Sequence, residues 1–261
     1  MNAETDEIAY FCHGMPGSEH DARLIKTVDD RVRLIAPNLL TASSLDPMHD
    51  LLADFDESTR EIADGQINVV GFSIGAMAAI KIAAARPKRV GRLTLISPAA
   101  PLSLGDFLPE MAGKPVFDLA ITRPRTLRVL TFVQGLVSAV APGFLIKQLF
   151  AKCGPAEKKL IDNKTFQEVI RHSFANSFRR HPAAYVRFVR SYVGDWSSAL
   201  SNISCPVDLW HGEKDTWSPI AMSHALQEAL AGPAHLNSIP DTEHYSTLSE
   251  VSLAPIGEKT A

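Results

Sequence analysis

The sequence predicts an α/β fold in which a mostly parallel sheet of about six strands is covered by crossover helices and interrupted by a helical insertion. Short apolar runs rich in β-branched residues recur along the chain, and such runs between turn residues are typical of buried strands. Segments with apolar residues at three- and four-residue spacing lie between these runs. The 261 residues are enough for one large domain with an extensive core.

Composition excludes several other protein classes. Hydrophobic residues make up 46% and charged residues 21% of the chain, which is ordinary for a globular protein and excludes disorder. The formal net charge is −3, so we expect no nucleic-acid partner. Cys12, Cys153 and Cys205 show no metal or redox spacing, and the amino terminus is acidic. We therefore expect a cytoplasmic protein without a secretory signal, metal or cofactor.

The predicted strands and crossover helices alternate along the chain. Each strand is an apolar run bounded by turn residues, and the last helix starts after Ser218-Pro219, a favourable helix beginning. The strands are predicted over residues 8–12, 32–36, 67–71, 92–97, 206–211 and 235–239, and the crossover helices over 48–63, 74–85 and 220–230.

The alternation stops after Ser97 and resumes at Cys205, leaving about a hundred residues without a convincing strand pair. Pro and Gly divide this stretch into helical patterns. We expect residues 1–102 and 194–261 to form the α/β core and residues 103–193 to form a helical cap. The predicted cap helices cover residues 127–140, 144–152, 155–178 and 182–192.

Val129 to Ile146 carries no charge and is just long enough to be considered as a membrane span. Gln134-Gly135 and Pro142-Gly143 divide it into short pieces, so we predict cap helices and no membrane span. Phe132 and Phe144 are expected to line a substrate pocket beneath this cap.

Three arginines, Arg123, Arg125 and Arg128, precede this apolar segment. A solvated helix start is the simplest interpretation, and contact with anionic lipid is the alternative.

The segment Ile67 to Met77 places the pentapeptide Gly71-Phe72-Ser73-Ile74-Gly75 between an apolar strand and an Ala-rich helix. Glycines two residues before and after the serine let the chain turn sharply without side-chain clashes. Ser73 would then be exposed at a helix amino terminus, where backbone N–H groups converge. A serine in this position is suited to nucleophilic attack.

A serine nucleophile needs a base and an orienting acid, because its hydroxyl is weakly reactive at neutral pH. Asp215 follows the strand that ends near His211, and His244 follows the next strand. Both lie at the strand ends that also carry Ser73, in the chain order Ser, Asp, His. Asp106 is the alternative acid.

Other candidates near the strand ends have structural explanations. Asp241 and Glu243 flank His244 and could be mistaken for the acid. His13 and His211 each precede a glycine at a strand end, and we interpret them as histidines that brace turns.

These motifs resemble the α/β-hydrolase superfamily, whose nucleophile elbow and Ser-Asp-His order take this form. The resemblance covers nearly the whole chain and includes His13-Gly14-Met15-Pro16-Gly17-Ser18, which is similar to the family's HGxPGS oxyanion loop. It implies that Ser73, Asp215 and His244 form a catalytic triad. It also implies that the backbone N–H groups of Met15 and Ile74 bind the oxyanion.

The resemblance implies a serine hydrolase of the esterase, perhydrolase or carbon-carbon hydrolase branch. We expect cleavage of an ester-like bond in a small, partly apolar substrate through an acyl-enzyme, as in carboxylesterases. Hydrolysis of a carbon-carbon bond or a lactone by the same triad is one alternative. A non-catalytic ligand-binding or scaffold protein on this fold is another.

The family's opening β-hairpin has no room before the first strand, because only seven residues precede it. In the family's strand order, residues 32–36 would then form a sheet edge. Unpaired edges recruit partners or are protected, so we expect either a homodimer or blunting of this edge by Arg31, Arg33 and Pro37.

Overall fold

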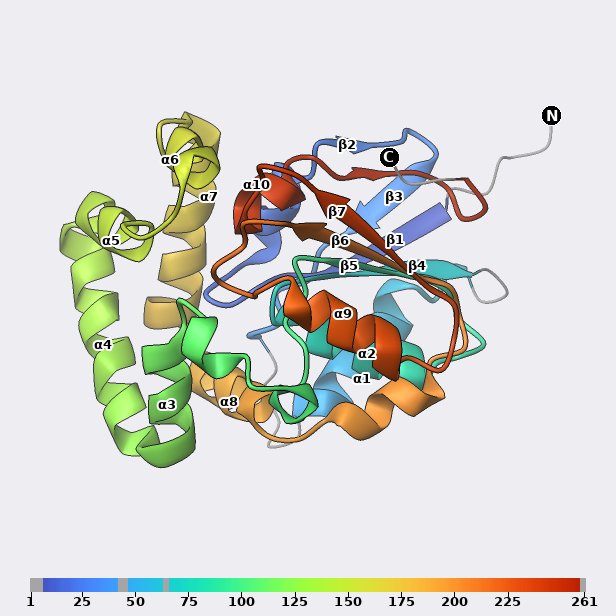
Figure 1. Cartoon of the computed structure of the whole chain (residues 1–261), viewed down its shortest axis with the longest axis horizontal. Coiled ribbons are helices and arrows are strands. Elements are labelled where there is room, and N and C mark those ends of the chain that lie inside the picture. The colour runs from blue at the N-terminus through green and yellow to red at the C-terminus, as the bar shows by residue number, and fades with distance from the viewer. Residues whose placement is uncertain (1–6, 42–46, 63–65, 259–261) are drawn as a thin grey trace.

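The computed structural model describes residues 7–41, 47–62 and 66–258. A central sheet lies on one side of the molecule, and a group of helices inserted between two of its strands lies on the other (Figure 1). Within the described residues, no helix is both long and apolar enough to cross a membrane.

The central sheet has six strands, and every neighbouring pair is parallel, as the sequence predicts. Its order is β3-β1-β4-β5-β6-β7, so β3 lies at an edge. The central strand β4 is buried along its whole length, because it lies between β1 and β5 and contacts the helix that follows it in the chain. The strands are β1 (Glu7–Cys12), β3 (Val32–Ile35), β4 (Ile67–Phe72), β5 (Val90–Ile96), β6 (Val207–Gly212) and β7 (Ala234–Ile239).

A second, two-stranded parallel sheet was not predicted from the sequence. It pairs β2 (Thr27–Val28) with β8 (Ser252–Leu253). Each strand has two residues, which is too short for a periodic pattern to be seen.

The edge strand β3 carries basic residues that form ion pairs within the chain. Arg31, just before β3, pairs with Asp29 and Glu258, and Arg33, within β3, pairs with Glu61.

The core helices are α1 (Pro47–Ser58), α2 (Gly75–Ala85), α9 (Ala221–Ala229) and α10 (His244–Leu248). The first three correspond to the predicted crossover helices, and α10 was not predicted. Helix α1 ends at Ser58, earlier than predicted. Four 3₁₀ segments cover Glu19–Leu24, Leu102–Leu104, Leu108–Glu110 and Ser197–Asn202.

The insertion between β5 and β6 is helical, and two of its details differ from the sequence prediction. Helix α3 begins with Lys114-Pro115 and was missed. The single helix predicted over residues 155–178 is broken at Asn163, whose side chain accepts a hydrogen bond from the Phe166 N–H and so caps a new helix. The helices are α3 (Lys114–Thr122), α4 (Pro124–Val140), α5 (Pro142–Leu149), α6 (Pro155–Ile161), α7 (Lys164–Phe174), a π-helical turn (Ala175–Arg180) and α8 (Pro182–Val193).

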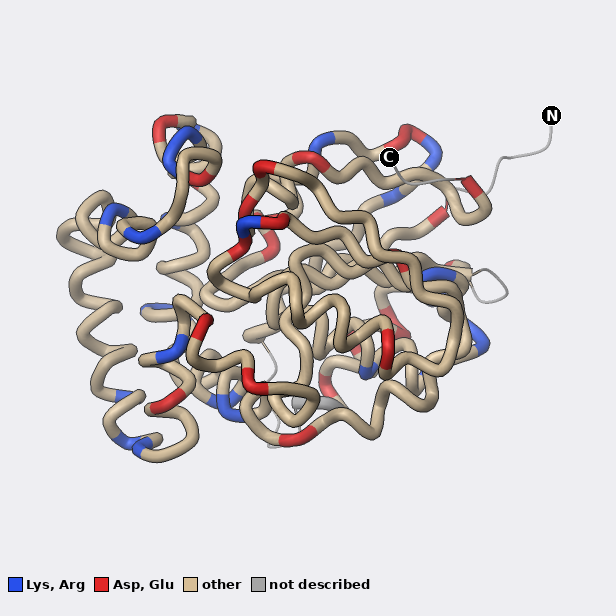
Figure 2. Tube along the Cα trace, viewed as in Figure 1, with Lys and Arg blue, Asp and Glu red and all other residues tan. Residues whose placement is uncertain are grey.

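Charge is distributed unevenly between the two parts of the molecule. Residues 114–193 contain 14 Lys and Arg but only 4 Asp and Glu, whereas the rest of the chain contains 12 and 25. Figure 2 shows the resulting contrast between the basic inserted helices and the predominantly acidic sheet region. The overall charge of −3 therefore conceals a strongly basic helical insertion.

Candidate active site

Ser73 occupies a sharp turn between β4 and α2. Its φ angle is 58°, in the left-handed region that non-glycine residues rarely adopt. The flanking glycines are required by close packing: a Cβ on Gly71 would lie 2.8 Å from Ala76 Cα, and one on Gly75 would lie 2.3 Å from the His13 carbonyl oxygen. The chain therefore holds Ser73 in a strained conformation that presents its side chain beyond the end of the sheet.

The loop from His13 to Ser18 packs directly on this turn. A Cβ on Gly14 would lie 3.0 Å from Ser73 Cβ, so glycine allows the two segments to approach. His13 is fully buried; its Nε2 accepts a hydrogen bond from the Leu39 N–H at 3.0 Å, and its Nδ1 lies 2.9 Å from the Gly14 carbonyl oxygen. Burial lowers the pKa of His13 to about 4, so a neutral His13 braces the loop.

The π-helical turn of the insertion holds the far end of the same loop. The Gly17 N–H donates to Ser177 Oγ at 3.0 Å, and Asn176 Nδ2 donates to the Gly17 carbonyl oxygen at 2.9 Å. Nearby, Ser173 Oγ donates to the buried Asp21 at 2.7 Å, and burial raises the pKa of Asp21 to about 8. The insertion therefore fixes the loop that carries Met15.

Asp215 and His244 form a buried hydrogen-bonded pair. His244 Nδ1 lies 2.8 Å from Asp215 Oδ2, and both residues are at most 6% exposed. The N–H groups of Trp217 and Ser218 donate to Asp215 Oδ1 at 2.8 and 3.0 Å. The carboxylate thus accepts hydrogen bonds on both oxygens, which fixes the orientation of the imidazole.

The electrostatics of Asp215 favour its ionised form. Burial alone would raise the pKa of Asp215. The charge of His244 and the hydrogen bond from its ring outweigh this effect, and the charge of His211 and the hydrogen bond from the Ser218 N–H lower the pKa further. His211 Nε2 donates to the Ser218 carbonyl oxygen at 2.7 Å, and its Nδ1 lies 2.6 Å from Ser223 Oγ. His211 therefore braces the loop that carries Asp215, as expected for a turn histidine.

The other acidic candidates lie elsewhere. Asp106 is exposed between two 3₁₀ segments. Asp241 is at the surface and forms an ion pair with Lys214. The buried Glu243 contacts the inserted helices, with its Oε2 accepting the Gly154 N–H at 2.6 Å.

Helices α6 and α10 cap each other and thereby position His244, the first residue of α10. The Glu243 carboxylate accepts the N–H groups of Gly154 and Glu157 at the start of α6. In return, Glu157 Oε1 accepts the Ser246 N–H at 2.8 Å. Burial raises the pKa of Glu157 to about 7, although its hydrogen bond with Ser246 opposes this.

Trp217 covers the imidazole of His244. The two rings are stacked, with centroids 5.6 Å apart and an interplanar angle of 12°. The Trp217 Nε1–H donates to Cys153 Sγ at 3.3 Å, which connects this ring to the insertion. On another side, Phe72 lies 4.9 Å from the His244 ring, centroid to centroid, so the residue next to Ser73 contacts the histidine.

A cavity of about 140 Å³ opens onto Ser73. Its wall also includes Met15, Ile74, Trp217 and Ser218, so both predicted oxyanion residues border it. Ser73 itself is 8% exposed, less than the sequence predicts, because side chains of the insertion cover the cavity onto which it opens. The insertion contributes apolar side chains that include Met111, Val116, Phe117, Leu149, Phe178, Tyr185 and Val189.

The prediction that Phe132 and Phe144 line this pocket is wrong. Neither borders the Ser73 cavity, and their exposed fractions are 64% and 58%. Helix α4 turns Leu127, Thr131 and Gly135 inward, which places Phe132 on the other side of the helix. Because α4 is apolar on most of its circumference, its sequence does not reveal which face points inward.

Several residues of the site were missed by sequence reasoning. Trp217, Glu157 and Glu243 contribute through contacts between segments far apart in the chain. Ser218-Pro219 was recognised as the beginning of a helix, but the sequence did not show that the Ser218 N–H donates a hydrogen bond to Asp215. Within the described residues, no group of three or more His, Cys, Asp or Glu side chains could hold a metal ion.

Comparisons with known proteins agree with this architecture. A pimeloyl-[acyl-carrier protein] methyl ester esterase of Aromatoleum aromaticum is 28% identical over 206 residues, which cover 74% of this chain and 72% of that protein. An esterase from Thermogutta terrifontis has a TM-score of 0.65 at 20% identity, covering 94% of this chain and 85% of that one. Est816, an N-acyl homoserine lactone degrading enzyme, has a TM-score of 0.61 at 18% identity, covering 94% and 88%.

The two structural matches show a shared fold. A model of the alpha/beta hydrolase family matches residues 9–253, which include the elbow, the loop before it and the Asp215–His244 pair. The protein belongs to the alpha/beta hydrolase family.

Proposed function

We propose that this protein is a cytoplasmic serine hydrolase that cleaves esters with a small apolar acyl group. The observation that carries the proposal is the strained Ser73, with φ 58°, at a cavity whose wall includes Trp217 and Ser218. Trp217 stacks on His244, and the Ser218 N–H donates to Asp215, its buried partner. The similarity to a methyl ester esterase over 74% of the chain supports ester hydrolysis.

In the proposed reaction, Ser73 Oγ attacks the ester carbonyl carbon while His244 Nε2 takes the hydroxyl proton. The carbonyl oxygen becomes an oxyanion, which the backbone N–H groups of Met15 and Ile74 stabilise. His244 then gives the proton to the departing alcohol, leaving an acyl-Ser73 ester. Water, deprotonated by His244, releases the carboxylic acid and restores the serine. Asp215 orients the imidazole throughout and stabilises its charged form.

The proposed role of the insertion is to cap the site and limit the acyl group. The cavity at Ser73 measures about 140 Å³, whereas pockets for drug-sized ligands measure about 300–1,000 Å³. The apolar side chains of Met111, Val116 and Phe117 border it. This favours a short acyl chain over a long one.

A panel of p-nitrophenyl esters of increasing acyl length tests the proposal, with lactones and β-diketones assayed beside it. We expect turnover to be greatest for short acyl chains and to be abolished by Ser73→Ala. Faster turnover of a lactone or diketone by the same serine would reassign the bond that is cleaved. Equal turnover by Ser73→Ala would exclude the proposed nucleophile.

A further inference from the structure

The large exposed apolar side chains of the described chain gather on one surface of the insertion. Their exposed fractions range from 46% to 87%. Large contiguous apolar patches on a protein surface mark interaction sites. We call this surface the apolar face; it consists of Ile121 of α3, Val129, Phe132, Val133, Leu136 and Val140 of α4, and Phe144 of α5.

Helix α4 is apolar on both its inner and its outer side. Leu127, Thr131 and Gly135 are buried against the molecule, while Val129, Leu136 and other apolar residues point outward. A helix that is apolar around its circumference is normally buried. The outer side of α4 is therefore exposed to solvent although its apolar composition is typical of a buried surface.

The apolar face belongs to the basic part of the molecule. Residues 114–193 have a formal net charge of +10, in a chain whose total is −3, and Figure 2 shows basic residues along these helices. Arg123, Arg125 and Arg128 are exposed where α3 ends and α4 begins. In the described part of the chain, none of these three arginines forms an ion pair. Their charge is thus available to an external anion.

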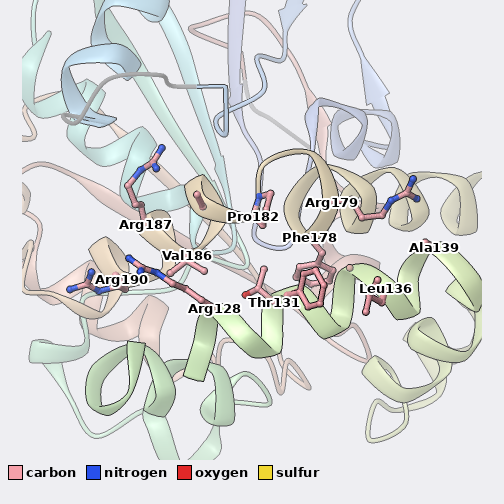
Figure 3. Close-up of a pocket in the computed structure, with 13 residues that line it drawn as sticks. Arg128, Thr131, Leu136, Ala139, Phe178, Arg179, Pro182, Val186, Arg187 and Arg190 are labelled. Carbon is pink, nitrogen blue, oxygen red and sulfur yellow. The ribbon is translucent and has the colours of Figure 1, made fainter. Parts of the chain in front are cut away.

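An arginine-lined groove of about 590 Å³ borders the apolar face. Phe132 and Leu136 belong to both surfaces. Figure 3 shows Arg128, Arg187 and Arg190 gathered toward one end of the groove, with Arg179 toward the other. Apolar side chains next to guanidinium groups match an amphiphile that has an anionic head and an apolar chain.

We propose that the apolar face docks onto the surface of an anionic phospholipid bilayer. Val129, Phe132, Val133, Leu136 and Val140 enter the boundary between head groups and acyl chains, while the arginines contact lipid phosphates. This assignment develops the lipid contact weighed for Arg123, Arg125 and Arg128, and it involves no membrane span.

Charge favours a lipid surface over a second copy of the chain. A symmetric dimer through this face would bring two strongly basic surfaces together. An asymmetric contact with the acidic sheet region would leave apolar side chains against a charged surface. An anionic bilayer satisfies the apolar and the basic groups at once.

Docking would place the lipid phase next to the Ser73 cavity. Phe178 borders both the arginine-lined groove and that cavity, so the two hollows adjoin each other at this side chain. Helix α4 likewise contributes Gln134 to the cavity and Gly135 to the groove. The groove beside the apolar face and the candidate active site are therefore lined in part by the same inserted helices.

Vesicle flotation with the full chain tests the proposal. We expect the protein to float with vesicles of phosphatidylcholine and phosphatidylglycerol, but not with phosphatidylcholine alone. About 1 M NaCl, where the Debye length is about 3 Å, should weaken binding. Ser73→Ala should float like the wild type, because docking does not require catalysis; failure of the proposed chemistry therefore leaves this test intact.

Two sets of variants separate the apolar and the basic contributions. Phe132→Gln with Leu136→Gln should lower the vesicle partition coefficient at least tenfold, since each buried apolar side chain contributes strongly. Arg125→Gln and Arg128→Gln should each lower it about fivefold. Arg60→Gln, an exposed arginine of the sheet region, is the matched control and should change nothing. Unchanged melting temperatures show that the variants remain folded.

Three results would overturn the proposal. The first is the absence of flotation with anionic vesicles, and the second is binding unaffected by Phe132→Gln with Leu136→Gln in a folded protein. The third is a dimer in sedimentation velocity that these substitutions dissociate, since it would assign the apolar face to a second copy.

Discussion

Replacing Gly75 by alanine tests whether the elbow and the His13–Ser18 loop act as one unit. A Cβ at this position would lie 2.3 Å from the His13 carbonyl oxygen and 2.4 Å from that of Cys12. Such contacts are not tolerated below 3.0 Å, so the two backbones must separate by about 0.7 Å. The displacement falls between Ser73 and the loop that carries Met15.

We expect Gly75→Ala to lower the free energy of unfolding by about 1–3 kcal/mol, as overpacking does. It should also lower kcat/KM for an acetyl ester about a hundredfold, because displacements near 1 Å at a reacting centre cost about that much. Urea denaturation and steady-state kinetics measure the two effects separately.

Gly143→Ala is the matched control for this substitution. A Cβ at Gly143, in α5, has no neighbouring heavy atom within 4 Å, so stability and kcat/KM should be retained. Wild-type kinetics together with wild-type stability in Gly75→Ala would refute the close packing on which the site depends.

Further predictions concern the acid, the pH dependence and the cavity wall. Asp215→Asn should lower kcat about 10³- to 10⁴-fold, because the amide favours the wrong imidazole tautomer, whereas the exposed Asp106→Asn should retain activity; the opposite order in kinetic assays would reassign the acid. The pKa of Glu157 rises from 4.5 to about 7 on burial, so the folded state keeps a proton that the unfolded state releases, and stability falls as pH increases through this interval. Glu157→Gln should therefore show a smaller decrease in melting temperature between pH 5 and pH 7 than the wild type. Equal decreases would show that the titration of Glu157 does not cause the pH dependence of stability. Phe117→Ala should raise the ratio of butyrate to acetate ester turnover by enlarging the cavity, while Phe132→Ala leaves it unchanged; the reverse would restore Phe132 to the pocket.

The six strands of the central sheet and the elbow could be predicted from local sequence. Buried parallel strands such as β4 consist of continuous apolar residues, which makes them visible as runs. The elbow needs glycines at fixed positions around Ser73, and close packing of Gly71 and Gly75 explains why. The pairing of Asp215 with His244 depended on the family resemblance, because 29 positions separate them.

Contacts between distant segments could not be predicted from local sequence. The capping of α10 by Glu157 joins residues 89 positions apart, and no periodicity encodes such a contact. Helix α10 has five residues, too few for a helical pattern. The inward face of α4 could not be predicted for a different reason: both sides of this helix carry apolar residues.

Covalent labelling of the intact protein with a fluorophosphonate, followed by peptide mass spectrometry, tests the proposed nucleophile most directly. The reagent should phosphonylate Ser73 alone among the serines, at a rate strongly reduced in Asp215→Asn, because Ser73 borders the cavity and, in the proposed mechanism, His244 takes its proton. Ser218 and Ser223 also contact histidine rings, but both are buried. Failure to label a folded protein, or labelling of another serine with Ser73 unmodified, would contradict the proposal that Ser73, His244 and Asp215 form a working triad.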